Sequence, residues 1–271
     1  MSEVNYLFVY SVVDEAGSLM ANVLRQYIHF DKLRDNYWMS GNIGLLEVSE
    51  DIVYTDNLEK RYQVNPKTII FISRHSSTAK IKTLSVHVSG NPVRSADFGG
   101  SPRSLAPSHP ILMRSVLINL DSLATSRGLN KEYKVTMEVT HHGPTEITCP
   151  SCFVEIGSSI EEWRDERAAH VVVEAILEAI EKPSEGKVCI GFGGPHYAPT
   201  FTRKVLEDKY AVGHIFSKYV IDDIDAKIIS EALRKTMNTK LALLDWKGMR
   251  GGTRQKIRSY LEDLRVSYEK I

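Results

Sequence analysis

The sequence predicts an α/β protein in which a mixed β-sheet lies between layers of helices, as a single domain spanning residues 1–271. Residues 6–13, YLFVYSVV, are almost all apolar and β-prone, which is typical of a strand buried on both faces. Similar runs at 68–72 and 187–192 alternate with helix patterns, an order that favours the α/β class. A chain of 271 residues with 42% hydrophobic residues is long enough to bury such a core.

The first half of the chain contains a predicted helix, a further predicted strand and two predicted loops. A loop is expected at residues 14–18 and a helix at 19–27. Residues 83–89 alternate, which predicts a strand with Leu84 and Val86 on one face and His87 on the other. Residues 90–110 are rich in proline and glycine and predict a long loop, a feature that is usually functional or disordered.

The second half continues the alternation of helices and strands. We predict helices at 111–127, from Ser158 or Ser159 to 182, at 225–236 and at 253–270, and strands at 133–140 and 187–192. Gly128 and Pro183 end the first two helices. Glu161 or Glu162 completes a capping box for the second helix. The C-terminal region is therefore expected to be helical, and its lysines and arginines make it basic.

Charge and targeting signals restrict the partners. The formal net charge is zero, so nucleic acid would have to bind a local basic patch. The N-terminal residues lack a signal-peptide pattern, and no apolar run approaches the ~20 residues of a membrane span. We expect a cytoplasmic protein that has no membrane partner.

The three cysteines do not predict a disulfide framework. Cys149 and Cys152 have the C-x-x-C spacing of a zinc half-site or a redox pair, but no second C-x-x-C accompanies them. We favour a structural or incidental role over metal binding and over redox chemistry.

Histidines close or adjoin four of the predicted strands, at His75, His87, His142 and His196. Functional sites of open α/β sheets gather at the carboxyl ends of strands. Side chains that are scattered in sequence can therefore meet there and form a zinc or catalytic site.

Two adjacent histidines raise a question of orientation. Strict alternation places His142 on the same face as Glu138, and His141 on the apolar face. One metal ion would then not take both rings unless Gly143 breaks the strand. Glu138 could orient a ring, share a metal or act as a general base, and the alternative is an exposed carboxylate on a solvated strand face.

Known nucleotide motifs are missing from the glycine-rich segment. Residues 191–202, GFGGPHYAPTFT, have neither G-x-G-x-x-G spacing nor a Walker sequence, so we expect no nucleotide cofactor. No G-x-S-x-G or H-E-x-x-H is present either. His196 at the tip of this loop stays a candidate.

Seven blocks of sequence, in order along the chain, resemble the D-aminoacyl-tRNA deacylases of the archaeal and plant type. They are SRH (73–75), LSVHVSGN (84–91), ADFGGSPRSLAP (96–107), THHGPT (140–145), FVEIGSSIEEW (153–163), GFGGPHYAPTFT (191–202) and VGHIFSKY (212–219). The resemblance implies a zinc-dependent hydrolase of the ester between a D-amino acid and the 3′ end of tRNA. It also implies a fold like those of peptidyl-tRNA hydrolase and the phosphorylases.

With this resemblance, we assign expected roles. His75, His87 and His142 are the expected zinc ligands, and Glu138, His141, His196 and Asp97 are the expected catalytic group. The acceptor end of aminoacylated tRNA is expected to bind Arg94, Arg103, Lys247, Arg250 and Arg254, unless these cations are only a solvated surface.

Three alternative functions remain open on the sequence. A zinc-dependent peptidase or amidohydrolase of the same fold would carry the same histidines. A non-catalytic tRNA-binding protein would tolerate their loss. A nucleoside phosphorylase is suggested by the fold alone.

Overall fold

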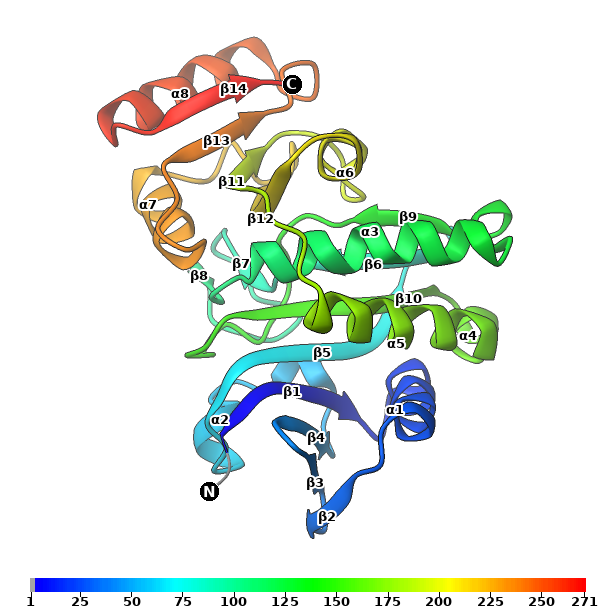
Figure 1. The fold of residues 1–271 in the computed structure, drawn as a ribbon. Coiled ribbons are helices and arrows are strands. Elements are labelled where there is room, and N and C mark those ends of the chain that lie inside the picture. The colour runs from blue at the N-terminus through cyan, green and yellow to red at the C-terminus, as the bar shows by residue number, and fades with distance from the viewer. Residues whose placement is uncertain (1–2) are drawn as a thin grey trace.

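The computed structural model describes residues 3–271, and its larger sheet has eight strands. In spatial order they are β2 (Asp31–Arg34), β3 (Tyr37–Ser40), β4 (Ile43–Val48), β1 (Val4–Ser11), β5 (Pro66–Ser76), β10 (Ser151–Ser158), β6 (Thr83–His87) and β9 (Lys134–Met137). The sheet is mixed: β1, β4, β5 and β10 are parallel, whereas β6 pairs with β10 in the antiparallel direction (Figure 1).

Helices cover one face of this sheet. Helices α1 (Glu15–Tyr27), α3 (Pro110–Ser126) and α5 (Glu166–Glu181) pack against one another and against the strands (Figure 1). The 3₁₀ helix η1 (Ile52–Tyr54) and helix α2 (Leu58–Arg61) lie on the other face, over a core that includes Leu7, Phe71 and Phe153. The predicted α/β class with a mixed sheet flanked by helices is thus confirmed.

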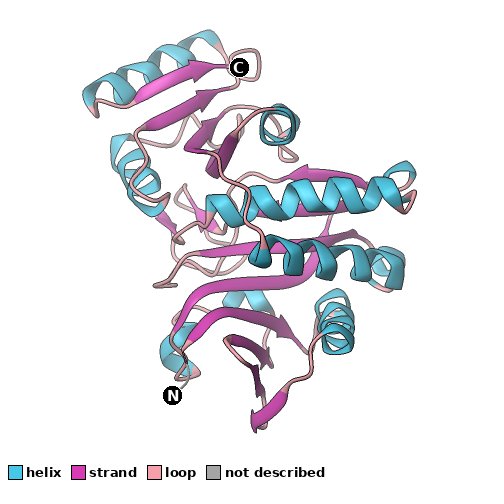
Figure 2. Ribbon diagram, viewed as in Figure 1, coloured by secondary structure: helices cyan, strands magenta, loops and turns pink. Residues whose placement is uncertain are grey.

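A second sheet of four parallel strands follows in the sequence. Its order is β12 (Tyr210–Phe216), β11 (Lys187–Phe192), β13 (Leu241–Leu244) and β14 (Ser267–Lys270). Helices α6 (Pro199–Glu207), α7 (Ala226–Lys235) and α8 (Gly251–Asp263) alternate with these strands, as Figure 2 shows. One buried cluster includes side chains of this sheet together with those of α3, while the single-domain organisation stays a prediction.

Several predicted boundaries are wrong for identifiable reasons. Helix α1 begins at Glu15 instead of residue 19, because the Asp14 carboxylate caps it by accepting from the Gly17 backbone N–H. The helix predicted to reach residue 182 is interrupted after α4 (Ile160–Trp163), and Asp165 caps α5. The predicted capping box is present and uses Ser159 and Glu162.

Some strands of the structure were not predicted from the sequence. Strand β10 lies between β5 and β6 in the interior of the larger sheet, and all eight of its residues are buried, so its sequence does not alternate. The helix predicted at 253–270 ends at Asp263, and β14 follows, so the C-terminal region is not purely helical. The long loop at 90–110 contains a short ribbon of β7 (Gly90–Asn91) and β8 (Ser104–Leu105).

No helix among the described residues is long and apolar enough to cross a bilayer.

Candidate active site

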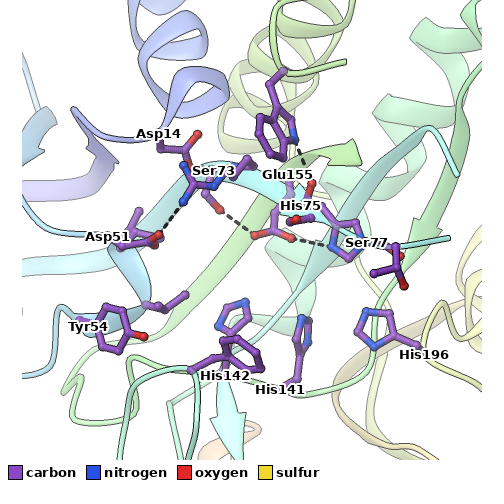
Figure 3. A pocket seen from close by; sticks show the side chains of 17 residues that line it. Asp14, Asp51, Tyr54, Ser73, His75, Ser77, His141, His142, Glu155 and His196 are labelled. Carbon is purple, nitrogen blue, oxygen red and sulfur yellow. Dashed lines mark hydrogen bonds and ion pairs between the residues drawn. The ribbon is translucent and has the colours of Figure 1, made fainter. Parts of the chain in front are cut away.

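A cavity of about 890 Å³ opens on the face of the larger sheet that carries η1 (Figure 3). Its volume falls in the range of about 300–1,000 Å³ that is typical of small-molecule sites. The lining combines titratable and aromatic side chains. The titratable ones are His75, His141, His142, His196, Glu155, Asp14, Asp51 and Arg74. The aromatic ones are Tyr54, Phe98 and Trp163.

Strand register brings the first of these side chains together. In β5 and β10, Ser73 lies opposite Glu155, and His75 lies opposite Gly157. In β6, His87 lies opposite Phe153, on which its ring stacks with centroids 5.1 Å apart. Because β6 is antiparallel to β10, His87 does not share a sheet edge with His75. The two histidines converge on the face of the sheet, where Glu155 lies between them.

Two buried carboxylates connect the histidines. Oε2 of Glu155 lies 3.5 Å from His75 Nδ1 and 3.4 Å from His87 Nε2, and the Ser73 hydroxyl donates to its other oxygen at 2.7 Å. Glu138 follows β9, and its Oε1 lies 3.2 Å from His75 Nδ1. The His196 Nε2 lies 2.8 Å from Glu138 Oε2. Glu138 is buried, so it is not an exposed carboxylate on a solvated face.

His141 and His142 point to the same cluster, contrary to the orientation predicted by alternation. Strand β9 ends at Met137, before either histidine, and His142 adopts a positive φ of 43°. The chain therefore turns, and the two ring centroids lie 4.3 Å apart. Gly143 permits this path, because a Cβ there would lie 2.4 Å from the Val53 carbonyl oxygen.

Backbone carbonyls orient both rings. The Nδ1 of His141 lies 2.7 Å from the Val139 carbonyl oxygen, and that of His142 lies 2.6 Å from the Gly143 carbonyl oxygen. A carbonyl only accepts, so each Nδ1 carries the proton and each Nε2 presents a lone pair to the cluster. Burial and the neighbouring imidazoles lower the pKa of His141 well below its usual value and that of His142 to about 4, which keeps both rings neutral near pH 7.

The carboxylates have the opposite effect on the other histidines. Burial alone would lower the pKa of His75 and of His87, but Glu155 and Glu138 outweigh it and raise both. Burial would also raise the pKa of Glu155, yet His87 and His75 hold it well below its usual value. The site thus combines ionised carboxylates, two charge-stabilised histidines and two neutral ones.

The donor atoms fit a metal cation. Three groups each bring their donor atoms within 4.8 Å of one another: His87 with His141 and His142, His75 with Glu138 and His196, and His87 with Glu138 and Glu155. Within residues 3–271, Nδ1 of buried His87 has no hydrogen-bond partner, whereas Nε2 of His87 and Oε1 of Glu138 have only the ion-pair contacts given above, which lack hydrogen-bond geometry. Unsatisfied buried polar atoms are costly, and a bound cation would satisfy them. His141, and not His75, joins His87 and His142 in one group.

The remaining predicted residues lie away from this cluster. Asp97 is exposed and does not line the cavity, whereas the next residue, Phe98, does. Arg94 is exposed, and Arg103 forms an ion pair with Asp225 at 2.5 Å. Lys247 and Arg250 border a second cavity of about 390 Å³. The Arg254 guanidinium lies over the Trp246 ring, 5.0 Å from its centroid.

The sequence analysis missed Glu155 as a site residue. A signal was present in the sequence: an acidic residue lies inside the apolar run 153–157, and an unpaired carboxylate is rarely buried. The two cysteines of the C-x-x-C motif do not approach the cluster: Cys152 belongs to the core under the helices, and Cys149 packs against the core on the other face.

Comparisons with known proteins decide the family. The family model of D-aminoacyl-tRNA deacylase matches residues 62–269 of this chain. The chain belongs to the D-aminoacyl-tRNA deacylase family. Proteins named D-aminoacyl-tRNA deacylase are similar to it: one of Staphylothermus marinus is 35% identical over 98% of this chain and 99% of its own length. One of Methanosarcina barkeri is 39% identical over 84% of this chain and 74% of its own length.

A solved structure supports the fold. The crystal structure of a conserved protein of unknown function superimposes with a TM-score of 0.92 at 34% identity. The match covers 100% of this chain and 96% of the other. Both sheets therefore belong to an architecture that this relative shares.

Proposed function

We propose that this protein hydrolyses the ester bond of D-aminoacyl-tRNA and releases the D-amino acid and tRNA. The observation that carries the proposal is the buried cluster of histidines and carboxylates at the cavity, in a chain of the deacylase family. The partner is aminoacylated tRNA with its acceptor end in the cavity, and the place of action is the cytoplasm.

Zinc is the metal that the donor set fits best. The Nε2 lone pairs of His141 and His142, oriented by backbone carbonyls, and one ring nitrogen of His87, which gives up its proton when the metal binds, would hold it. A zinc ion bound there would polarise the ester carbonyl and supply hydroxide near neutral pH.

A residue of the protein supplies the proton that the leaving ribose oxygen needs. Water adds to the carbonyl carbon, the bond to the ribose oxygen breaks, and that oxygen takes up a proton. His196 is partly exposed and lines the cavity, so we assign the proton transfer to it. Glu138 is buried behind His196 and 2.8 Å from its Nε2, so it orients that ring instead of touching the substrate.

The phosphates of the acceptor arm would contact the cations outside the cavity. Lys247 and Arg250 are exposed, and Arg254 lies beside them on α8. Arg94 is also exposed, whereas Arg103 would first have to break its ion pair with Asp225. These contacts would make tRNA binding strongly dependent on salt.

Deacylation of matched D- and L-tyrosyl-tRNA tests the proposal, with a chelator and with zinc added back. We expect loss of the D-ester, inhibition by the chelator and recovery with zinc, while the L-ester survives. Hydrolysis of peptides in place of either ester would identify a peptidase or amidohydrolase. Binding of tRNA without any hydrolysis would identify a non-catalytic binding protein.

A further inference from the structure

Two aromatic side chains at the rim of the active-site cavity are unusually exposed. Phe98 is 70% exposed and Tyr54 is 55% exposed, and both line the cavity. Single exposed apolar side chains are common on protein surfaces. Two on the rim of one buried histidine cluster indicate a binding surface.

These side chains project from segments that are closely packed. Gly99 has a φ of 75°, and a Cβ there would lie 2.0 Å from the Val53 carbonyl oxygen and 3.2 Å from Cδ1 of Tyr54. The Gly143 backbone N–H donates to the Phe98 carbonyl at 2.9 Å, and the Asn91 side chain donates to the Gly99 carbonyl at 2.7 Å. The segments of Phe98, Tyr54 and His142 are therefore fixed against one another, with the aromatic rings left in solvent.

The third aromatic side chain of the lining, Trp163, is bound by other residues of the protein. Trp163 donates its indole N–H to the His75 carbonyl at 2.9 Å, and the Arg74 guanidinium lies over its ring at 5.5 Å from the centroid. Arg74 in turn pairs with Asp51 at 2.7 Å. This wall of the cavity is charged, whereas the wall of Tyr54 and Phe98 offers free aromatic faces.

We propose that Phe98 and Tyr54 form a stacking platform for the terminal adenine base of the tRNA. This inference rests on the proposed function, because the 3′-terminal ribose carries both the scissile ester and that base. A surface for the base must then lie beside the histidine cluster. The backbone hydrogen bond from Gly143 to Phe98 places Phe98 next to His142. In Figure 3, Tyr54 lies on the His142 side of the labelled histidines. Unpaired bases at the ends of RNA are commonly held by stacking on aromatic side chains.

Binding of uncharged RNA tests the platform without turnover. A fluorescent acceptor-stem hairpin that ends in CCA is titrated with the protein and compared by anisotropy with the same hairpin that ends in CC. We expect tighter binding of the CCA hairpin, and we expect Phe98→Ala to weaken it about 5- to 100-fold. Binding of the CC hairpin should not change. Phe98→Trp should keep the preference, and Leu33→Ala, a change at an exposed side chain of the edge strand β2, should leave both affinities unaltered.

Equal affinity for the two hairpins, or an equal loss for both in Phe98→Ala, would overturn the inference. A second measurement separates the base from the amino acid: KM for D-alanyl-tRNA and for D-tyrosyl-tRNA should rise together in Phe98→Ala. A rise with D-tyrosyl-tRNA alone would mean that Phe98 contacts the amino-acid side chain, which also overturns the inference. If the wild type prefers the CCA hairpin but hydrolyses no D-ester, the proposed function fails and the base site stands. If the wild type hydrolyses the D-ester but does not prefer the CCA hairpin, the proposed function stands and the base site fails.

Discussion

The buried imidazole of His214 on β12 accepts a hydrogen bond from the hydroxyl of Thr140, with 3.1 Å between Nδ1 and Oγ1. Its Nε2 donates to the Ala106 carbonyl oxygen at 3.0 Å, which fixes the tautomer. The Thr140 hydroxyl also accepts from the Ile215 N–H at 3.0 Å. The smaller sheet thus holds the residue that precedes His141, and burial lowers the pKa of His214 to about 3.

We expect His214→Gln to reduce the pH dependence of stability. In the unfolded chain this histidine titrates near its usual value of about 6.5, so protons favour unfolding as the pH falls from there towards 3. Without this group the free energy of unfolding should fall less steeply with acid, by up to about 1.4 kcal/mol per pH unit. Urea unfolding of both proteins at pH 7, 6 and 5 measures the difference. If the free energy of unfolding fell equally with pH in both proteins, His214 would not be a buried neutral ring.

Removal of a proposed ligand should cost the metal. In His142→Ala the group of three donor nitrogens is broken, so we expect zinc content after dialysis to drop and D-ester turnover to be lost. Circular dichroism should show an intact fold. His29→Ala is the matched control, since His29 is exposed and lies 3.7 Å from Asp31, away from the histidine cluster. Full activity with full zinc content in His142→Ala would remove this residue from the site.

Neutralising Glu155 should weaken the site while Ser73 keeps its acceptor. The carboxylate of Glu155 raises the pKa of His75 and His87, so Glu155→Gln should lower both. We expect kcat/KM to fall about 10- to 100-fold, as for other residues that support metal ligands. The acidic limb of its pH profile should shift to lower pH. Glu161→Gln, at an exposed position of α4, serves as control, and equal profiles for both variants would contradict the prediction.

The salt dependence of KM should report the proposed phosphate contacts. Each lost contact reduces the slope of log affinity against log salt by about 0.7–0.9. Replacing Lys247, Arg250 and Arg254 together by glutamine should therefore flatten the slope by about 2 to 3. The control replaces three other cations, Lys32, Lys131 and Lys182, which are exposed elsewhere and change the net charge equally. A similar flattening in both variants would indicate a general charge effect.

The C-x-x-C cysteines should be dispensable for zinc. Burial raises the pKa of Cys149 and of Cys152 to about 12, so neither forms a thiolate readily. We expect Cys149→Ser to keep full zinc content and activity. Cys152 lies in the core, so Cys152→Ser should lower the melting temperature but not the zinc content. Loss of zinc in Cys149→Ser would restore the half-site interpretation.

Local patterns were enough to predict much of this protein. The apolar runs that became β1 and β11 and the capping box at Ser159 are encoded within a few residues. The sequence also singled out His75, His87, His142, His196 and Glu138, all of which contribute to the cluster. The histidines recur at or near the ends of the predicted strands, which is visible without knowing which strands pair.

The tertiary structure decided which of these side chains share a site. Glu155 became part of it because β10 lies between β5 and β6, a pairing of segments about 70 to 80 residues apart. His141 joined His142 because the chain turns after Met137, at a positive φ that alternation cannot anticipate. Strand register and turn geometry depend on contacts between distant segments. The sequence therefore determined which chemical groups were available, and the packing of the sheet selected which ones meet.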